Sequence, residues 1–196
     1  PTTAVYLDGL NNLTLGNIST NTSNANVNVT ALGGINVNGT ITSGTGTIYL
    51  GADRTAADLA GDGTGTLALM ASSSVTSANT TASAISLRGA DITIDTSGSP
   101  ATVSAAGVGG GVVIGSSVNT RPMMIGDGGA VAGVNLSSAE LAQISENARI
   151  TFGDATQTGD ITFFKATPAT TAGAAIYAIQ DTATGGKIVL DDDFAV

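Results

Sequence analysis

The amino-acid sequence lacks most of the side chains on which enzyme chemistry depends. It contains no cysteine, no histidine and no tryptophan, and only 4% of its 196 residues are aromatic. Without cysteine there are no disulfides, thiolate nucleophiles or zinc–thiolate sites. Without histidine there are no Ser–His or Cys–His catalytic pairs and no histidine metal ligands. The sequence therefore predicts a protein that is not an enzyme and has no resident cofactor.

Charge is scarce as well. Charged residues make up 11% of the chain, the net charge is −9, and the basic residues are scattered singly at Arg54, Arg88, Arg121, Arg149, Lys165 and Lys187. Binding of nucleic acid needs clustered positive charge, so nucleic acid is excluded as a partner. No apolar run is long enough for a membrane span, and residues 1–8 do not resemble a signal peptide. We therefore expect the chain to start within a mature protein.

The chain is rich instead in small aliphatic residues and in turn formers. Hydrophobic residues make up 42% of it and glycine occurs 27 times, a composition that disfavours disorder. Apolar and small polar residues alternate in fourteen segments of three or four residues, which we interpret as short β-strands. The segments are 4–7, 13–15, 27–29, 35–37, 47–50, 66–69, 84–87, 92–94, 112–114, 123–125, 150–152, 161–163, 176–179 and 188–190.

Three of these segments resemble one another, namely those within residues 46–50, 65–69 and 83–87. Their central apolar residues are about 20 residues apart, which is the length of one coil of a parallel β-helix. We therefore expect an all-β chain that forms a right-handed parallel β-helix of about nine coils. Residues 1–196 would form a single domain or a segment of a longer solenoid.

One segment departs from the β pattern. Ser137 and Glu140 have the spacing of a capping box, and Leu136 and Leu141 have the spacing of a hydrophobic staple. We expect a short helical excursion over about 137–147. Packing along the side or the end of the solenoid is the preferred interpretation, and a protruding binding element is the alternative.

Residues 121–162 carry a more specific resemblance. An Arg-Pro strand at 121–126 leads through a Leu-Ser-x-x-Glu-Leu helix at 136–141 to a strand that ends in Gly153-Asp154, and a Gly-Asp-Ile-Thr strand follows at 159–162. This block is similar to one that recurs in large bacterial exoproteins of the filamentous-haemagglutinin-like and autotransporter type. The resemblance implies a right-handed β-helix on the cell surface or outside the cell, exported by a two-partner or autotransporter route and serving as an adhesin or an extended stalk.

Seven of the thirteen asparagines lie in Asn-x-Ser/Thr sequons for glycosylation. These are Asn12, Asn17, Asn21, Asn28, Asn38, Asn79 and Asn135. Strand alternation by itself places Asn and Thr two residues apart on one exposed face, which would explain the sequons without any modification. Glycosylation of these residues is therefore a prediction with a structural alternative.

An enzyme would have to rely on carboxylates. Some β-helical polysaccharide lyases and hydrolases use paired carboxylates, but here the aspartates lie mostly beside glycine, where backbone geometry favours Asp in turns. The examples are Asp8, Asp62, Asp127, Asp154 and Asp160. Aromatic residues that could stack on a sugar are few, although Tyr6 and Tyr49 occupy positions that would face outward.

Calcium is the one metal that the sequence suggests. The run Asp191-Asp192-Asp193 offers hard oxygen ligands, but its spacing fits neither an EF-hand loop nor a glycine-rich calcium repeat. A solvated acidic end is the preferred interpretation.

These features favour a rigid structural or adhesive element of a bacterial cell-surface or secreted protein. Its partner would be the surface of a host or neighbouring cell, or matrix. The alternative is a self-assembling subunit of an extracellular filament or surface layer, because the ends of a β-helix present unpaired backbone that can pair end to end.

Overall fold

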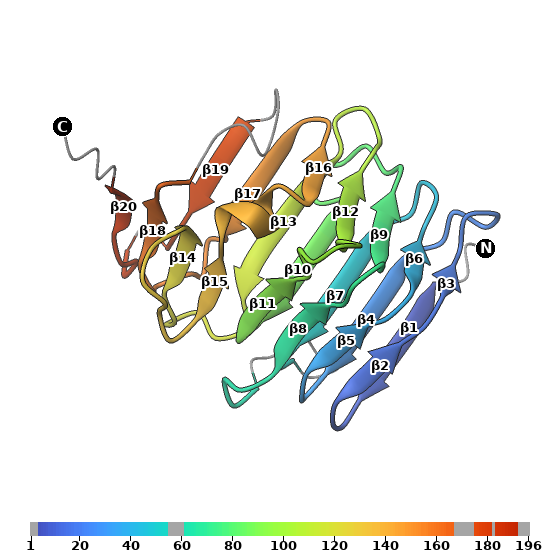
Figure 1. The fold of residues 1–196 in the computed structure, drawn as a ribbon, viewed down its shortest axis with the longest axis horizontal. Helices are drawn as coiled ribbons and strands as arrows, with labels where there is room; N and C mark the ends of the chain where they lie inside the picture. The colour runs from blue at the N-terminus through green and yellow to red at the C-terminus, as the bar shows by residue number, and fades with distance from the viewer. Residues whose placement is uncertain (1–3, 55–60, 167–174, 182, 192–196) are drawn as a thin grey trace.

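The chain forms a parallel β-helix (Figure 1). The computed structural model describes residues 4–54, 61–166, 175–181 and 183–191. These residues contain twenty strands and one short helix, and all of the strand pairs in their sheets are parallel. The predicted all-β parallel β-helix with one short helical excursion is therefore confirmed.

The longest sheet, sheet A, runs from the first described strand to near the last. Its seven strands lie in the order β1 (Val5–Gly9), β4 (Val27–Ala31), β7 (Ile48–Ala52), β10 (Ile85–Gly89), β13 (Gly111–Ser116), β17 (Arg149–Gly153) and β19 (Ala175–Ile179). Each coil contributes one strand to this sheet, so the described residues form seven coils and not the nine expected. At roughly 4.8 Å between neighbouring strands, the stack is about 30 Å long.

Two further sheets complete the early coils. Sheet B contains β2 (Leu13–Leu15), β5 (Ile35–Val37), β8 (Thr66–Leu69) and β11 (Asp91–Ile94). Sheet C contains β3 (Ile18–Ser19), β6 (Thr40–Thr42), β9 (Ser74–Ser77), β12 (Thr102–Ala105) and β16 (Ile144–Glu146). The first coil is therefore β1, β2 and β3, and the next three coils repeat this order.

The apparent sequence copies are not consecutive coils. Ile48 pairs with Ile85 in sheet A, whereas Leu67 lies in sheet B and pairs with Ile35 and Ile92. The spacing of about 20 residues therefore separates a strand of sheet A from the next strand of sheet B, and that strand from the next strand of sheet A. It is not the length of one full coil. The prediction was wrong because strands of different sheets share the same alternating composition, and because β7 and β8 are much further apart in the sequence than β4 and β5.

A fourth sheet, sheet D, breaks the simple order of the chain. It contains β15 (Val134–Leu136), β14 (Met123–Gly126), β18 (Ile161–Phe164) and β20 (Ile188–Asp191), in that spatial order. Strand β14 precedes β15 in the sequence but lies between β15 and β18 in the sheet. The chain therefore steps forward to place β14 and then back to place β15 before it continues.

Side-chain carboxylates join sheet B to strand β15 and to the helical turn that follows it. The backbone N–H of Asn135 donates to Oδ1 of Asp91 (2.8 Å), and the backbone N–H of Ile94 donates to Oε1 of Glu140 (2.9 Å). Carboxylates thus accept hydrogen bonds that a neighbouring strand would otherwise take, at the point where the regular stacking is interrupted.

The helix α1 (Ser138–Leu141) is a single turn. Ser137 is its N-cap, and the predicted capping box with Glu140 is present in both directions. The predicted range of 137–147 is too long, because Ile144 already belongs to β16 and pairs with Val103. Pairing with β12 satisfies the backbone of this segment and buries Ile144, which outweighs a weak helical preference.

The interior is a narrow column of aliphatic side chains. The buried apolar residues are mostly Ile, Leu, Val and Ala, and they form one continuous cluster that runs from Leu15 in sheet B to Ile161 in sheet D. The largest of them, Phe152, packs edge to face against Phe163 with ring centres 5.5 Å apart. Thin core layers therefore explain why the sequence has so few aromatic residues.

Candidate functional site

Tyrosines gather on the outer face of sheet A. Tyr6, Asn28, Tyr49 and Ser86 follow one another in register on β1, β4, β7 and β10. Successive side chains of a strand point to opposite faces, and the next residue after Tyr49, Leu50, is fully buried. The expected outward direction of Tyr6 and Tyr49 is therefore confirmed.

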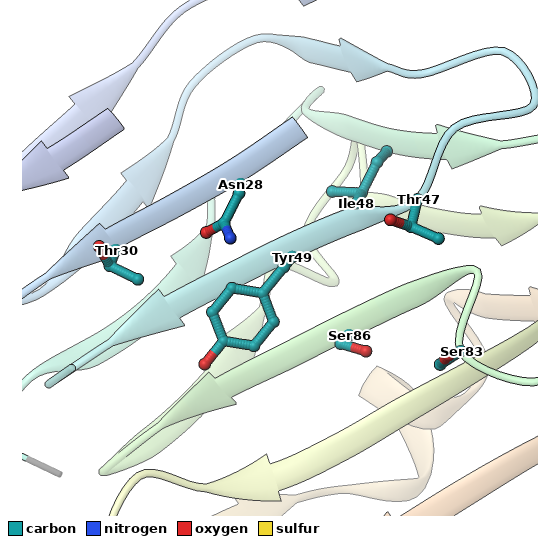
Figure 2. Close-up of a pocket in the computed structure, with 7 residues that line it drawn as sticks. All are labelled: Asn28, Thr30, Thr47, Ile48, Tyr49, Ser83 and Ser86. Atoms are coloured by element: carbon teal, nitrogen blue, oxygen red, sulfur yellow. The ribbon is translucent and has the colours of Figure 1, made fainter. Parts of the chain in front are cut away.

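The ring of Tyr49 lies along its own strand. Gly51, two residues further on, has no side chain, and a Cβ placed there would be only 2.7 Å from Cε1 of Tyr49. The ring therefore fills the space that any other residue at position 51 would need. Figure 2 shows the ring broadside, beside the strand that carries it and next to the strand of Ser86.

A shallow hollow of about 280 Å³ adjoins this ring (Figure 2). It is lined by Asn28, Thr30, Thr47, Ile48, Tyr49, Ser83 and Ser86. None of these residues is charged, and together they offer an amide, several hydroxyls and an aromatic plane. Such a lining can hold an uncharged polar ligand by stacking and by hydrogen bonds.

Two charged residues of neighbouring strands, Asp8 and Arg88, are engaged in the fold. Asp8 accepts a hydrogen bond from the hydroxyl of Thr30 (2.8 Å). Arg88, which stacks on Gly51, forms an ion pair with Asp154 further along the stack. The described residues that line the hollow are therefore uncharged, although the whole chain is acidic.

Two other hollows flank Glu140. One of about 580 Å³ lies against the turn after β11, and one of about 360 Å³ lies against the loop after β14. The Glu140 carboxylate accepts hydrogen bonds from the backbone of Ile94 and from Ser137, and Asp95 accepts two from Ser97. Their carboxylates are thus occupied by the fold, and none of the described residues that line either hollow is aromatic.

Three of the sequon asparagines extend the backbone ladder between the first two coils. Asn12, Asn17 and Asn21 each accept, at Oδ1, a hydrogen bond from a backbone N–H of the second coil. The donors are Gly34, Thr40 and Gly44, at 2.7, 2.9 and 2.8 Å. Asn24 and Asn26, which are not in sequons, do the same for Thr45 and Thr47. These asparagine side chains continue the hydrogen bonding between the two coils through the turns, where the backbone groups do not pair as they do between strands.

Asn79 and Asn135 use their side-chain nitrogen in the fold. Nδ2 of Asn79 donates to the carbonyl of Thr45 (2.7 Å), and Nδ2 of Asn135 donates to the carbonyls of Val131 (3.0 Å) and Gly133 (2.8 Å). An N-linked glycan is attached at this nitrogen, so it would displace these bonds. Both sequons therefore have a structural explanation.

The remaining two sequon asparagines lie on outer surfaces. Asn28 lines the hollow beside Tyr49, and Asn38 is exposed after β5. The structure thus brings one of the seven residues to the candidate site and distributes the others along the turns. Glycosylation itself stays a prediction.

The same type of side-chain-stabilised turn occurs at Asn79 and at three aspartates. Oδ1 of Asn79 accepts both the backbone N–H and the hydroxyl of Thr81, and Asp62, Asp95 and Asp154 do the same with the Ser or Thr two residues later. These hydrogen bonds lower the pKa of Asp62 and Asp95, the hydroxyl bond contributing most. The expected role of Asp62 and Asp154 in turns is confirmed, whereas Asp8 lies within β1.

The buried carboxylate of Asp53 also serves the fold. It accepts hydrogen bonds from the N–H of Gly63 and the hydroxyl of Ser117, and Arg54 donates to the carbonyl of Ser117 (2.8 Å). Among the described residues no group of three acidic side chains is placed to hold a metal ion. Asp192 and Asp193 lie outside the described residues, so the solvated acidic end stays a prediction and calcium binding there stays its alternative.

The neutral residues around Tyr49 were not recognised from the sequence. Thr30, Thr47, Ser83 and Ser86 come from three successive coils, and their spacing depends on coil lengths that the sequence does not reveal. The local signal that existed was Tyr49-Leu50-Gly51, an aromatic residue followed on the same strand face by a glycine.

Because comparison with known proteins finds no match, the functional interpretation of this chain rests on the geometry described above. In the part of the chain that the structure describes, no helix is both long and apolar enough to cross a membrane. No protein-family model, curated protein or solved structure matches this chain.

Proposed function

We propose that the chain is a rigid, non-catalytic structural and adhesive element of a bacterial cell-surface or secreted protein of the filamentous-haemagglutinin-like type. The observation that carries the proposal is the unbroken stack of seven parallel strands in sheet A. A solenoid of this kind acts as a stiff rod, because each coil contacts its neighbours along its whole width. Its sides then offer extended surfaces for contact with other cells or matrix.

The outer face of sheet C supports this proposal. Ser19, Thr42, Thr76, Ser104 and Ser145 lie in register on five successive strands. This row of hydroxyls carries no charge, so the approach of another surface does not require the desolvation of ions. A neutral polar face suits contact with hydrated cell surfaces.

Adhesion can be tested with fluorescent beads coated with the purified protein. We expect the beads to bind to bacterial cells, cultured epithelial cells or fibronectin-coated plates more than beads coated with heat-denatured protein do. Binding no greater than that of the denatured control on all three surfaces would overturn the adhesive role. Release of reducing sugar from acidic or neutral polysaccharides would overturn the non-catalytic role.

End-to-end assembly into a filament is the second candidate, and the end coils favour it. Leu7 of β1 stacks on the fully buried Val29 but is 41% exposed, and Ile176 of β19 stacks on the fully buried Ile150 but is 46% exposed. Both belong to inward-facing columns in which they are the last described residues. Another coil placed on either end would bury them.

Negative-stain electron microscopy separates the two candidates. Fibres many times longer than the roughly 30 Å stack would show assembly, and Leu7→Lys should then reduce fibre length because it places a charge in the stacking interface. Val108→Lys is the matched control, since Val108 is 87% exposed in a loop away from both ends. Short isolated rods at high protein concentration would exclude assembly of this chain alone.

A further inference from the structure

We propose that the outer face of sheet A around Tyr49 binds a neutral, extended glycan, with the sugar rings stacked on tyrosine. The proposal deepens the adhesive function proposed above, on which it rests, by naming the chemical class of the ligand. It is carried by three features of this face: a flattened aromatic ring, an uncharged polar lining and the spacing of two tyrosines.

The first feature is the orientation of Tyr49. Its ring occupies the space over Gly51 and is seen broadside in Figure 2. A pyranose presents a face of C–H groups that packs on a flat aromatic ring, while its hydroxyls project sideways. A ring that stood upright from the sheet would offer only its edge to a ligand lying along the surface. The lack of a side chain at Gly51 therefore allows the Tyr49 ring to lie flat and to serve as a platform for stacking.

The second feature is the set of groups beside the platform. Asn28 lies on the neighbouring strand on one side, and Ser83 and Ser86 lie on the other side (Figure 2). An amide offers both a donor and an acceptor, as do hydroxyls, and sugar hydroxyls need both. The described residues of the lining carry no charge, and the chain as a whole has a net charge of −9, which disfavours anionic polysaccharides.

The third feature is the position of Tyr6. It lies in the same outward column as Tyr49, two strands away, with Asn28 between them, and it is 72% exposed. Two strand spacings amount to roughly 9.6 Å, which is close to the repeat of a disaccharide in an extended β-1,4-linked chain. A hexasaccharide that runs along the stack can therefore contact both tyrosines, whereas a disaccharide can contact one.

The test is an NMR titration of the purified protein with neutral β-1,4-linked sugars, namely cellobiose and cellohexaose, and chitobiose and chitohexaose. Because a shallow site with few contacts binds weakly, we expect dissociation constants on the order of 1 mM for the hexasaccharides. Tyr49→Ala should weaken binding about tenfold or more, and Tyr49→Phe should retain most of it. Tyr6→Ala should weaken binding of the hexasaccharides but leave that of the disaccharides unchanged.

Two further variants keep the test independent of folding. Gly51→Ala retains the tyrosine but displaces its ring, so it should weaken binding even where Tyr49→Ala is poorly folded. Tyr177→Ala is the matched control, because Tyr177 lies in the same outward column far from the hollow and contacts Arg149, whose guanidinium carbon is 5.1 Å from the ring centre. It should leave the affinity unchanged.

Three outcomes would overturn the proposal. The first is that no neutral sugar binds at about 10 mM, a level that detects even millimolar affinities. The second is that Tyr49→Ala binds the sugars as tightly as the wild type, and the third is that an oligogalacturonate binds equally or more tightly.

The bead assay on the same variants separates this proposal from the adhesive function. Retained adhesion without sugar binding would overturn the glycan site alone, and sugar binding without adhesion would overturn the adhesive role alone.

Discussion

Arg88 of β10 forms an ion pair with Asp154, which follows β17 two strands further along sheet A. The intervening strand contributes Gly115, which stacks directly on Arg88. A Cβ at Gly115 would lie 2.8 Å from Nη1 of Arg88, so the guanidinium passes through space that only glycine leaves open. One ion pair thereby fastens three successive coils.

Gly115→Ala should destabilise the protein by about 1–2 kcal/mol, because the new methyl group collides with Arg88 and separates it from Asp154. The free energy of unfolding in urea at pH 7 is the measurement. Gly98→Ala is the control, since a Cβ there would meet no atom within 4 Å. Equal effects of the two substitutions would show that Arg88 does not need the cleared space.

The same ion pair predicts a loss of stability in acid. Burial by itself would raise the pKa of Asp154, but hydrogen bonds from Thr156 and Arg88 and the charge of Arg88 outweigh it and hold the pKa below 3.8. A lowered pKa stabilises the folded state at pH values above the unfolded-state value of 3.8, and this contribution disappears as the pH falls through the folded-state pKa.

Asp154→Asn should therefore reduce the free energy of unfolding by about 1 kcal/mol at pH 6, a modest value because solvent screens the partly exposed pair. The difference from the wild type should shrink as the pH is lowered from 4 towards 2, as followed by urea unfolding at each pH. A difference that stays constant over this range would contradict the lowered pKa.

The sequence predicted sheets A and B well and sheet C poorly. All fourteen strands read from alternation are present, and most of the strands that were missed belong to sheet C. In β6, for example, one inward residue, Ile41, stands between Thr40 and Thr42. A single apolar residue between hydroxyls does not stand out from a turn. These strands exist because neighbouring coils pair with them, not because of a local pattern.

The candidate site illustrates the same limit. The outward direction of Tyr49 follows from strand alternation, which the sequence displays. Its neighbours Asn28 and Ser86 lie 21 positions before it and 37 after it (28, 49 and 86), and only the register of β4, β7 and β10 brings them together. Because the coils differ in length, no fixed period in the sequence could have paired them.

The asparagine ladder predicts unequal effects of substituting exposed asparagines. Asn17→Ala removes the acceptor of the Thr40 N–H, so it should lower the free energy of unfolding by about 1 kcal/mol. Asn38→Ala should have almost no effect, because Asn38 is exposed and makes no side-chain hydrogen bond within the described residues. Thermal melting of both variants checks this, and equal melting temperatures would contradict a structural role for Asn17.

Glycosylation, where it occurs, should follow the availability of Nδ2. Asn79 and Asn135 donate from this nitrogen to backbone carbonyls, so we expect them to be unmodified in protein purified from its natural source. Any glycans should lie on Asn12, Asn17, Asn21, Asn28 or Asn38. Peptide mapping by mass spectrometry is the measurement, and a glycan on Asn135 would contradict the expectation. An intact mass equal to that of the bare polypeptide would remove glycosylation altogether.

The buried carboxylate of Glu146 predicts that the protein loses stability as the pH rises, which is opposite to the effect of Asp154. It is paired with the buried Ala105 in the inward register of sheet C, and both its carboxylate oxygens are buried without a hydrogen-bond partner in the described structure. Burial raises the pKa of Glu146 from 4.5 to about 7. The folded state therefore holds a proton that the unfolded chain releases, and its stability falls as the pH rises from about 4.5 to 7.

Glu146→Gln should remove this pH dependence and leave the protein about 1 kcal/mol more stable than the wild type at pH 8, after allowance for solvent screening of the partly buried group. Glu140→Gln is the matched control with the opposite expected sign. Its carboxylate accepts hydrogen bonds from Ile94 and Ser137, so an amide in its place loses an acceptor and should destabilise the protein by about 1 kcal/mol. Urea unfolding of the three proteins at pH 5 and pH 8 measures both effects. If Glu146→Gln lost as much stability as the wild type between these two pH values, the carboxylate would have to be solvated in the folded chain, and the inward register of the last strand of sheet C would be wrong.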